Sequence, residues 1–190
     1  MNQNLHSEYL PSISWWREWI SNGMPSLNDD LPYRKRSWAN RCTIDSPNGP
    51  LTLTIPVRKP SEGHYRQNEI LLSDHDNWRS KHWHALQSSY FNSPFFEYYQ
   101  DDIKAVYDGN QESLTEFNLQ LINVVAGLIQ LNSETIGMAR RNIEAKGRQN
   151  DLEQNGYYQV FAHKHGFIPN LSIIDLLMNM GPESILYLAK

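Results

Sequence analysis

The segment from residue 40 to residue 58 carries the pattern that most narrows what this chain can fold into. Asn48-Gly49, a dipeptide favoured at tight hairpin turns, lies between two runs in which apolar and polar residues alternate. A turn at this dipeptide places four apolar side chains on one face in two facing pairs, Ile44 with Leu53 and Cys42 with Ile55. The sequence therefore predicts an antiparallel hairpin, with strands near 41–46 and 51–57 and that apolar face in the core.

Helix signals follow the hairpin. Polar residues that cap helix N-termini stand ahead of runs with helical apolar spacing. The expected helices are 77–92 after Asp76, a second from Ser93-Pro94 to Gly109, a third after the pair Ser113 and Glu116, a fourth from Ser172 to Gly181, and a last one from Pro182. Together these elements predict an α+β fold, in which a small antiparallel sheet around the 40–58 hairpin is covered by helices from 77–131 and 172–188.

Length and composition indicate one globular domain. The chain has 190 residues, of which 39% are hydrophobic and 20% charged, so it can bury a core of its own. Residues 138–156 differ from the rest because they are polar, with only scattered apolar side chains. We interpret the chain as a single domain, 1–190, with a polar arm or linker at about 138–156.

Several classes of protein are disfavoured by simple counts. A single cysteine, Cys42, permits no internal disulfide and fits a reducing cytoplasm, and it falls on the apolar face of the hairpin, where packing is expected. No apolar run approaches the roughly 20 residues of a membrane helix, and the N-terminus does not have the pattern of a signal peptide. The net charge of −4 argues against nucleic-acid binding. We therefore expect a cytoplasmic protein with no membrane span and no nucleic-acid partner.

Several stretches, taken in order, resemble the WbqC-like family. They are Tyr9-Leu10-Pro11, YRKRSWANRC at 33–42, Ile55-Pro56-Val57, SPFFEYY at 93–99 and GFIPNLSIIDLLMNMGP at 166–182. The resemblance implies work on cytoplasmic precursors of bacterial surface polysaccharide, and it assigns no catalytic residue. Longer members carry a Gln-Pro dipeptide where this chain has Ser7-Glu8.

The densest group of basic residues in this acidic chain comes from its first third. Arg36 and Arg41 belong to the family-like stretch 33–42, and the expected hairpin brings Lys59 close to Arg41. Guanidinium groups bind phosphate or carboxylate through paired hydrogen bonds. We expect these three side chains to bind an anion. The alternative, that they are solvated charges at a strand edge that discourage aggregation, stays open.

Two titratable residues are candidate proton carriers. His82 lies on the expected helix beside Trp78, where a half-buried structural histidine is the alternative to a catalytic role. Asp175 follows Ser172 by three residues, so it is either a base or a carboxylate that complements the N-terminus of a helix. Both alternatives stay open for each residue.

The histidines do not predict a metal site. His82 and His84 would point about 200° apart on a helix, so they cannot share one ion. His163 and His165 would share a face of a strand, but the sequence suggests no third ligand. We expect neither a metal nor a cofactor.

The family-like polar residues are expected to meet in one cleft. A small anionic or sugar-phosphate ligand would be held there by Arg36, Arg41 and Lys59. The rest of the substrate would contact Asn40, Asn170 and Ser172. A proton would be moved by His82 or Asp175. Two functions stay open: a transferase-like enzyme acting on anionic precursors of surface polysaccharide, and a non-catalytic module that binds carbohydrate or protein through its aromatic residues. The sequence also leaves open a homo-oligomer.

Overall fold

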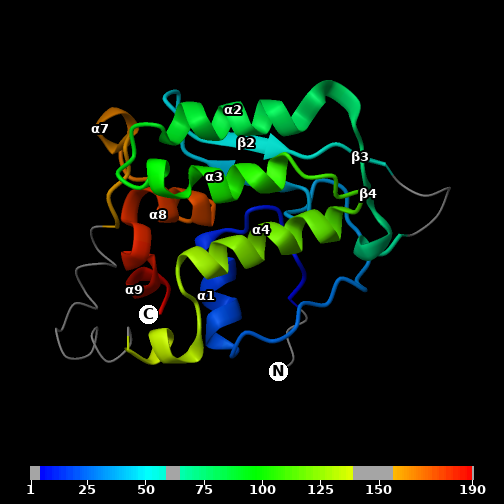
Figure 1. The fold of residues 1–190 in the computed structure, drawn as a ribbon, viewed down its shortest axis with the longest axis horizontal. Coiled ribbons are helices and arrows are strands. Elements are labelled where there is room, and N and C mark those ends of the chain that lie inside the picture. Colours follow the sequence, from blue (N-terminus) through cyan, green and yellow to red (C-terminus); the bar gives the residue numbers. More distant parts are fainter. Residues whose placement is uncertain (1–4, 59–64, 139–155, 190) are drawn as a thin grey trace.

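The computed structural model describes residues 5–58, 65–138 and 156–189 and has an α+β fold, as predicted (Figure 1). The helices are α1 (Ile13–Ser21), α2 (Trp78–Tyr90), α3 (Phe96–Tyr107), α4 (Leu114–Leu128), α7 (Ala162–His165), α8 (Ile173–Met180) and α9 (Ser184–Leu188), with 3-10 turns at Gln67–Glu69, His75–Asn77 and Gly181–Glu183. The strands are β1 (Arg41–Ile44), β2 (Leu51–Thr54), β3 (Val57–Arg58) and β4 (Leu71–Leu72). The arm expected at 138–156 lies almost wholly outside the described residues.

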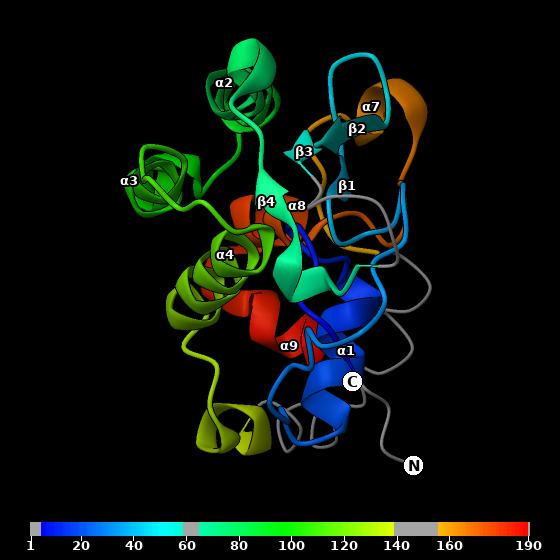
Figure 2. The same ribbon diagram turned by 90° about the vertical axis from the view of Figure 1, so that its right-hand side faces the viewer.

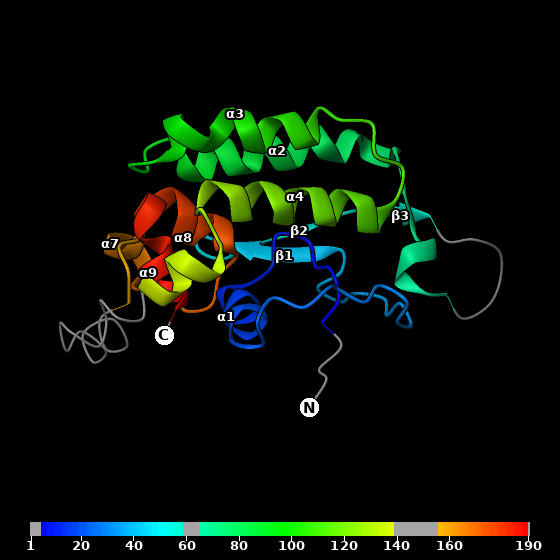
Figure 3. The same ribbon diagram turned by 60° about the horizontal axis from the view of Figure 1, so that its bottom comes forward.

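The helices and strands are arranged around α8. Figure 2 shows α2, α3 and α4 along one side of the molecule, the hairpin and α1 on the other, and α8 between them. Figure 3 shows α2, α3 and α4 running side by side with similar axis directions. Seven of the eight residues of α8 are buried, which is typical of a helix enclosed on all sides rather than one with a solvent face.

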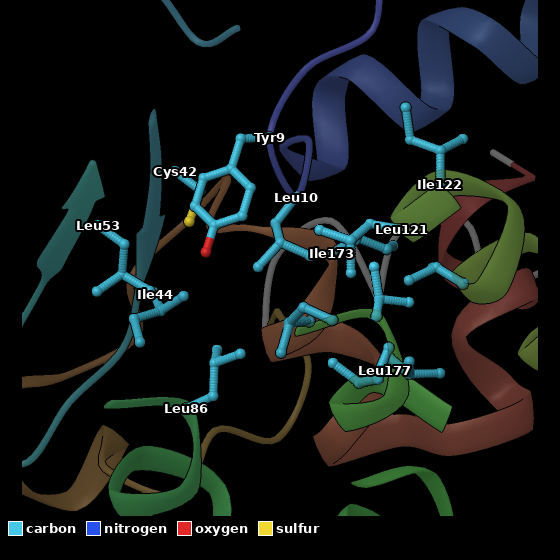
Figure 4. Close-up of a cluster of buried hydrophobic side chains, with 14 of the residues drawn as sticks. Tyr9, Leu10, Cys42, Ile44, Leu53, Leu86, Leu121, Ile122, Ile173 and Leu177 are labelled. Atoms are coloured by element: carbon cyan, nitrogen blue, oxygen red, sulfur yellow. The ribbon is translucent and has the colours of Figure 1, made fainter. Parts of the chain in front are cut away.

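One continuous hydrophobic core joins these elements. Figure 4 shows side chains from the N-terminal segment, the hairpin, α2, α4 and α8 directed into a common interior. Tyr9, Ile44 and Leu177 are fully buried there. The Cys42 thiol also packs in this core, as expected, and burial raises its pKa.

The hairpin confirms the predicted apolar face but not the predicted register. β1 and β2 are antiparallel, with Cys42 opposite Leu53 and Ile44 opposite Leu51, so the expected pairing was wrong by two residues. The cause is a turn centred one residue earlier than expected, on Pro47-Asn48, and closed by hydrogen bonds between Ser46 and Gly49: the Gly49 amide donates to the Ser46 carbonyl, and the Ser46 hydroxyl donates to the Gly49 carbonyl at 2.6 Å. A shift of two residues leaves every side chain on its original face. β3 and β4 form a second two-stranded sheet that the sequence analysis did not predict.

The predicted helix starts differ in outcome. Ser113 and Ser172 cap α4 and α8 with their side chains, as expected. Ser93 does not cap α3, because its hydroxyl donates to the Tyr90 carbonyl at 2.6 Å, and α3 begins three residues later. Asp76 does not cap α2 either; it has a left-handed φ of +70° and forms a surface ion pair with Lys81.

The segment 162–165 is helical rather than extended. His163 and His165 therefore do not share the face that a strand would have given them. The His165 Nε2 atom lies 3.2 Å from a carboxylate oxygen of Asp45 at the tip of the hairpin.

Two identical substitutions on β2 test the hairpin. Leu53 is 6% exposed and Leu51 is 37% exposed. Leu53→Ala should lower the free energy of unfolding by about 2–3 kcal/mol, because it opens a cavity in the core, whereas Leu51→Ala should cost less than about 1 kcal/mol. Urea denaturation of the two variants measures the difference. Equal losses would contradict the placement of β2.

Candidate functional site

The candidate site is a cavity of about 660 Å³ beside α1. Its walls come from the N-terminal segment, α1, β1 and residues 168–172. Charged side chains of both signs line it, with Glu8 and Glu18 on the acidic side and Arg41 as the basic residue.

Backbone hydrogen bonds hold these walls together. The Ile13 amide donates to the Leu171 carbonyl, and the Ser172 amide donates to the Thr43 carbonyl. Ser12 and Ser172 also form an isolated antiparallel bridge. Each of these serines is the N-cap of a helix, so the positive ends of α1 and α8 meet at the cavity wall next to β1.

Arg41 is the basic group of the cavity. Its Nε atom is buried and makes no hydrogen bond, and no described carboxylate forms an ion pair with it. The positive charge of Arg41 lies near Tyr33. Burial raises the pKa of the Tyr33 phenol, and the Arg41 charge partly offsets that rise. A guanidinium that forms no ion pair with a described carboxylate, in a cavity lined also by the N-caps of two helices, suits a phosphate or a carboxylate.

The acidic side contains a carboxyl that titrates near neutral pH. Burial, and to a smaller extent the charge of Glu18, raise the pKa of Glu8 to about 7. The neighbouring His6 lies 3.7 Å from a Glu8 oxygen. Its pKa is lowered, because the effect of burial is larger than the opposite effect of the Asp29 charge. Glu8 can therefore accept or release a proton at physiological pH.

Two tryptophans give the cavity aromatic walls. Trp15 is almost fully buried, and its indole N–H donates to the His6 carbonyl at 3.2 Å. Trp38 is 56% exposed, and its own carbonyl accepts from the Tyr9 amide. Apolar and aromatic walls with a few polar groups are typical of a site for a small molecule.

The structure brings three of the predicted site residues to this cavity. They are Arg41, Asn170 and Ser172. The Asn170 side-chain oxygen accepts from the Ser14 amide at 2.8 Å, and the Ser172 hydroxyl caps α8, so both side chains also stabilise the walls.

Two other predicted binding residues, Arg36 and Asn40, do not line the cavity. Arg36 is exposed and does not line the cavity. Asn40 is buried behind the hairpin, where its side-chain amide donates to the Ile55 carbonyl at 2.9 Å. Lys59 lies outside the described residues.

His82 belongs to a buried cluster behind the cavity wall. Its Nδ1 atom is 2.9 Å from the Tyr9 hydroxyl, which is in turn 2.6 Å from the Tyr107 hydroxyl. Burial lowers the pKa of His82 to about 4, and the Thr54 carbonyl offsets this only in part. His82 is therefore neutral at pH 7 and is separated from the cavity by Tyr9, which contributes to the lining. Its role as a proton carrier stays a prediction.

Asp175 belongs to a second buried cluster, at the start of α8. Its carboxylate accepts from the Tyr157 hydroxyl at 2.5 Å and from the Gln159 amide at 2.9 Å. Burial raises the pKa of Asp175 to about 6, and the hydroxyls of Tyr157 and Tyr90 partly counter that effect. The carboxylate does not line the cavity. The predicted single cleft is therefore divided: Arg41 faces a cavity, whereas His82 and Asp175 lie in separate buried clusters.

The sequence analysis missed the carboxylates of the site. Glu8 was noted only because it stands where longer family members carry Gln-Pro, and Glu18 belongs to no motif. Glu8 and Glu18 line one cavity only because the fold brings α1 back beside the N-terminal segment. The sequence analysis did not single out Trp38 as a site residue either. The one feature that could have indicated it is its position within the family-like stretch 33–42.

Two further structural findings concern metals and membranes. Within residues 5–58, 65–138 and 156–189, no three His, Cys, Asp or Glu side chains are grouped so that they could hold a metal ion. Among the helices of the described part of the chain, none combines the length and apolarity that crossing a membrane requires.

Comparison with known proteins gives one family and one curated relative. The model of the WbqC-like protein family matches residues 6–155 and 148–187. The chain is 25% identical over 199 residues to "Uncharacterized protein Rv1507c" of Mycobacterium tuberculosis (strain ATCC 25618 / H37Rv), covering 85% of this chain and 86% of that protein. No solved structure matches significantly.

Asp175 allows a test of the buried charge. Its pKa is raised from 3.8 to about 6, so between these values the folded state binds more protons than the unfolded state, and stability falls as the pH rises. Asp175→Asn should therefore stabilise the protein at pH 7.5, by on the order of 2 kcal/mol, and give little gain at pH 4. Thermal unfolding across this range measures it, with the exposed Asp101→Asn as control. A variant that is less stable than the wild type at pH 7.5 would contradict the assignment.

Proposed function

The chain belongs to the WbqC-like protein family, and we propose that it is a transferase-like enzyme that binds a small anionic sugar precursor, of the sugar-phosphate class, in the cavity at Arg41. The implied association of the family with bacterial surface polysaccharide supports the class of substrate. A cytoplasmic location, expected from the single cysteine, is part of the same proposal.

One observation carries this proposal: the Arg41 side chain lines the cavity, and no carboxylate of the described residues forms an ion pair with its guanidinium. A phosphate or carboxylate oxygen placed beside the guanidinium would bind it through charge-assisted hydrogen bonds. The positive ends of α1 and α8 add to the attraction for an anion.

The size of the cavity supports a ligand larger than a simple ion. A volume of about 660 Å³ falls within the roughly 300–1,000 Å³ that is usual for small-molecule sites. Trp15 and Trp38 offer apolar surface for the body of such a ligand.

Glu8 supports a catalytic rather than a purely binding role. A carboxyl with a pKa of about 7 in a ligand-sized cavity can take a proton from an attacking group of the substrate. His82 and Asp175 were the predicted proton carriers, but both lie outside the lining of the cavity. The geometry therefore favours Glu8 for that step.

The second candidate function is a non-catalytic module that binds carbohydrate or protein. The observation that favours it is a pair of exposed aromatic side chains near the turn from α2 to α3, Phe91 at 67% and Tyr98 at 74% exposure. Such rings suit an open contact surface. On this alternative, ligand binding would depend on these two residues and not on Arg41.

A charge-matched pair of variants tests the proposal. Glucose 6-phosphate should raise the melting temperature of the wild type by roughly 5–10 °C at about 100 times its Kd, whereas glucose should not. Arg41→Gln should abolish the shift, because the anion loses its guanidinium. Lys104→Gln, which removes a surface charge on α3, should keep it. The result that would count against the proposal is a full shift in Arg41→Gln.

A further inference from the structure

We infer that the ligand of this cavity carries a protonated amine in addition to its anionic group, and that Glu8 and Glu18 form the subsite for the amine. The inference rests on the proposed function, because it takes the anion to lie at Arg41. The substrate class then narrows from sugar phosphates in general to amino-bearing ones.

The first step is the pairing of two like charges. Glu8 comes from the segment before α1 and Glu18 from the second turn of α1, and both line the cavity. They lie close enough that the charge of Glu18 contributes to the raised pKa of Glu8. Two carboxylates that face one cavity repel each other unless a cation lies between them or one is protonated.

The second step is that the protein itself supplies no cation at this place. No described lysine or arginine forms an ion pair with either glutamate. His6 is the histidine within reach of Glu8, and burial lowers its pKa, so it is largely neutral at pH 7. Arg17, the neighbour of Glu18 in sequence, is turned away and donates to the Tyr187 carbonyl.

The third step separates the two charged subsites. Arg41 lines the same cavity but forms no ion pair with either glutamate, and its charge is not among the influences on the pKa of Glu8. A basic group and an acidic pair therefore stand apart in one cavity of about 660 Å³. A ligand that satisfies both has to carry both charges itself.

The chemistry favours an amine over the other cations. His6, Glu8 and Glu18 are not grouped tightly enough to count as a site for a metal ion within the described residues. An ammonium group is compact and has three hydrogen-bond donors, so it can bridge two carboxylates and still bond to a third acceptor. A hydroxyl has one donor and no charge, so it would leave the pKa of Glu8 raised and the carboxyl only partly ionised at pH 7.

Isothermal titration with four related compounds tests this. We expect glucosamine 6-phosphate to bind the wild type at least tenfold more tightly than glucose 6-phosphate or N-acetylglucosamine 6-phosphate, whose amine is absent or blocked. Glucosamine, which has no phosphate, should bind weakly.

Binding of the amine at pH 7 should release protons, because it favours the ionised form of Glu8. Titrations in buffers with different ionisation enthalpies measure this release. The other titratable groups that line the cavity are His6, Tyr9, Glu18, Arg41 and Cys42.

The variants assign the preference to residues. Glu8→Gln and Glu18→Gln, made separately, should each bring the two phosphates to within about twofold of each other while glucose 6-phosphate still binds. Arg41→Gln should weaken both. Melting temperatures check that each variant is folded; Glu8→Gln removes a buried charge and should not destabilise the protein.

The outcomes separate this inference from the function on which it rests. Equal affinity of the wild type for the two phosphates, with binding lost in Arg41→Gln, would overturn the amine subsite and leave the anion site standing. A preference for the amine that persists in both glutamate variants would overturn the assignment to Glu8 and Glu18. If neither phosphate binds the wild type, both proposals are wrong.

Discussion

Backbone hydrogen bonds between segments far apart in the sequence are the constraint on which this structure depends. The Ser172 amide donates to Thr43 on β1, and the Ile13 amide donates to Leu171. These bonds join the hairpin, α1 and the start of α8, so the helix N-termini face the strand that carries Arg41. The charged groups of the cavity are held by a rigid frame, which is how binding sites keep their geometry without a ligand.

The same frame separates the cavity from the polar groups of the interior. Tyr9 contributes to the cavity wall while its hydroxyl is turned inward to His82 and Tyr107. At the N-terminus of α8, the N-cap Ser172 lines the cavity, whereas Asp175 is turned toward Tyr157. Buried polar groups need partners, and these clusters supply them, so the core can contain a neutral histidine and a carboxyl with a raised pKa.

The part of the fold that could be predicted is the part that short-range rules decide. The alternation of apolar and polar residues correctly placed Ile44 on the buried face, because side chains two positions apart on a strand point the same way. The register could not be predicted in this way, because it depends on hydrogen bonds inside the loop. Ser93 was expected to cap a helix and instead bonds to the preceding turn, a choice that local sequence does not reveal. In the site, Arg41 could be predicted because it lies in a family-like stretch. Glu8 and Glu18 could not, because a pair of carboxylates from two elements leaves no pattern along the chain.

The central claim is that the cavity binds an anion through Arg41, and the most direct test is a crystal structure of the protein with glucose 6-phosphate. The account predicts phosphate oxygens at about 3 Å from the guanidinium nitrogens, with the sugar ring in the cavity beside Trp38. A phosphate bound elsewhere, with none of its oxygens within hydrogen-bond distance of the Arg41 guanidinium, would contradict it.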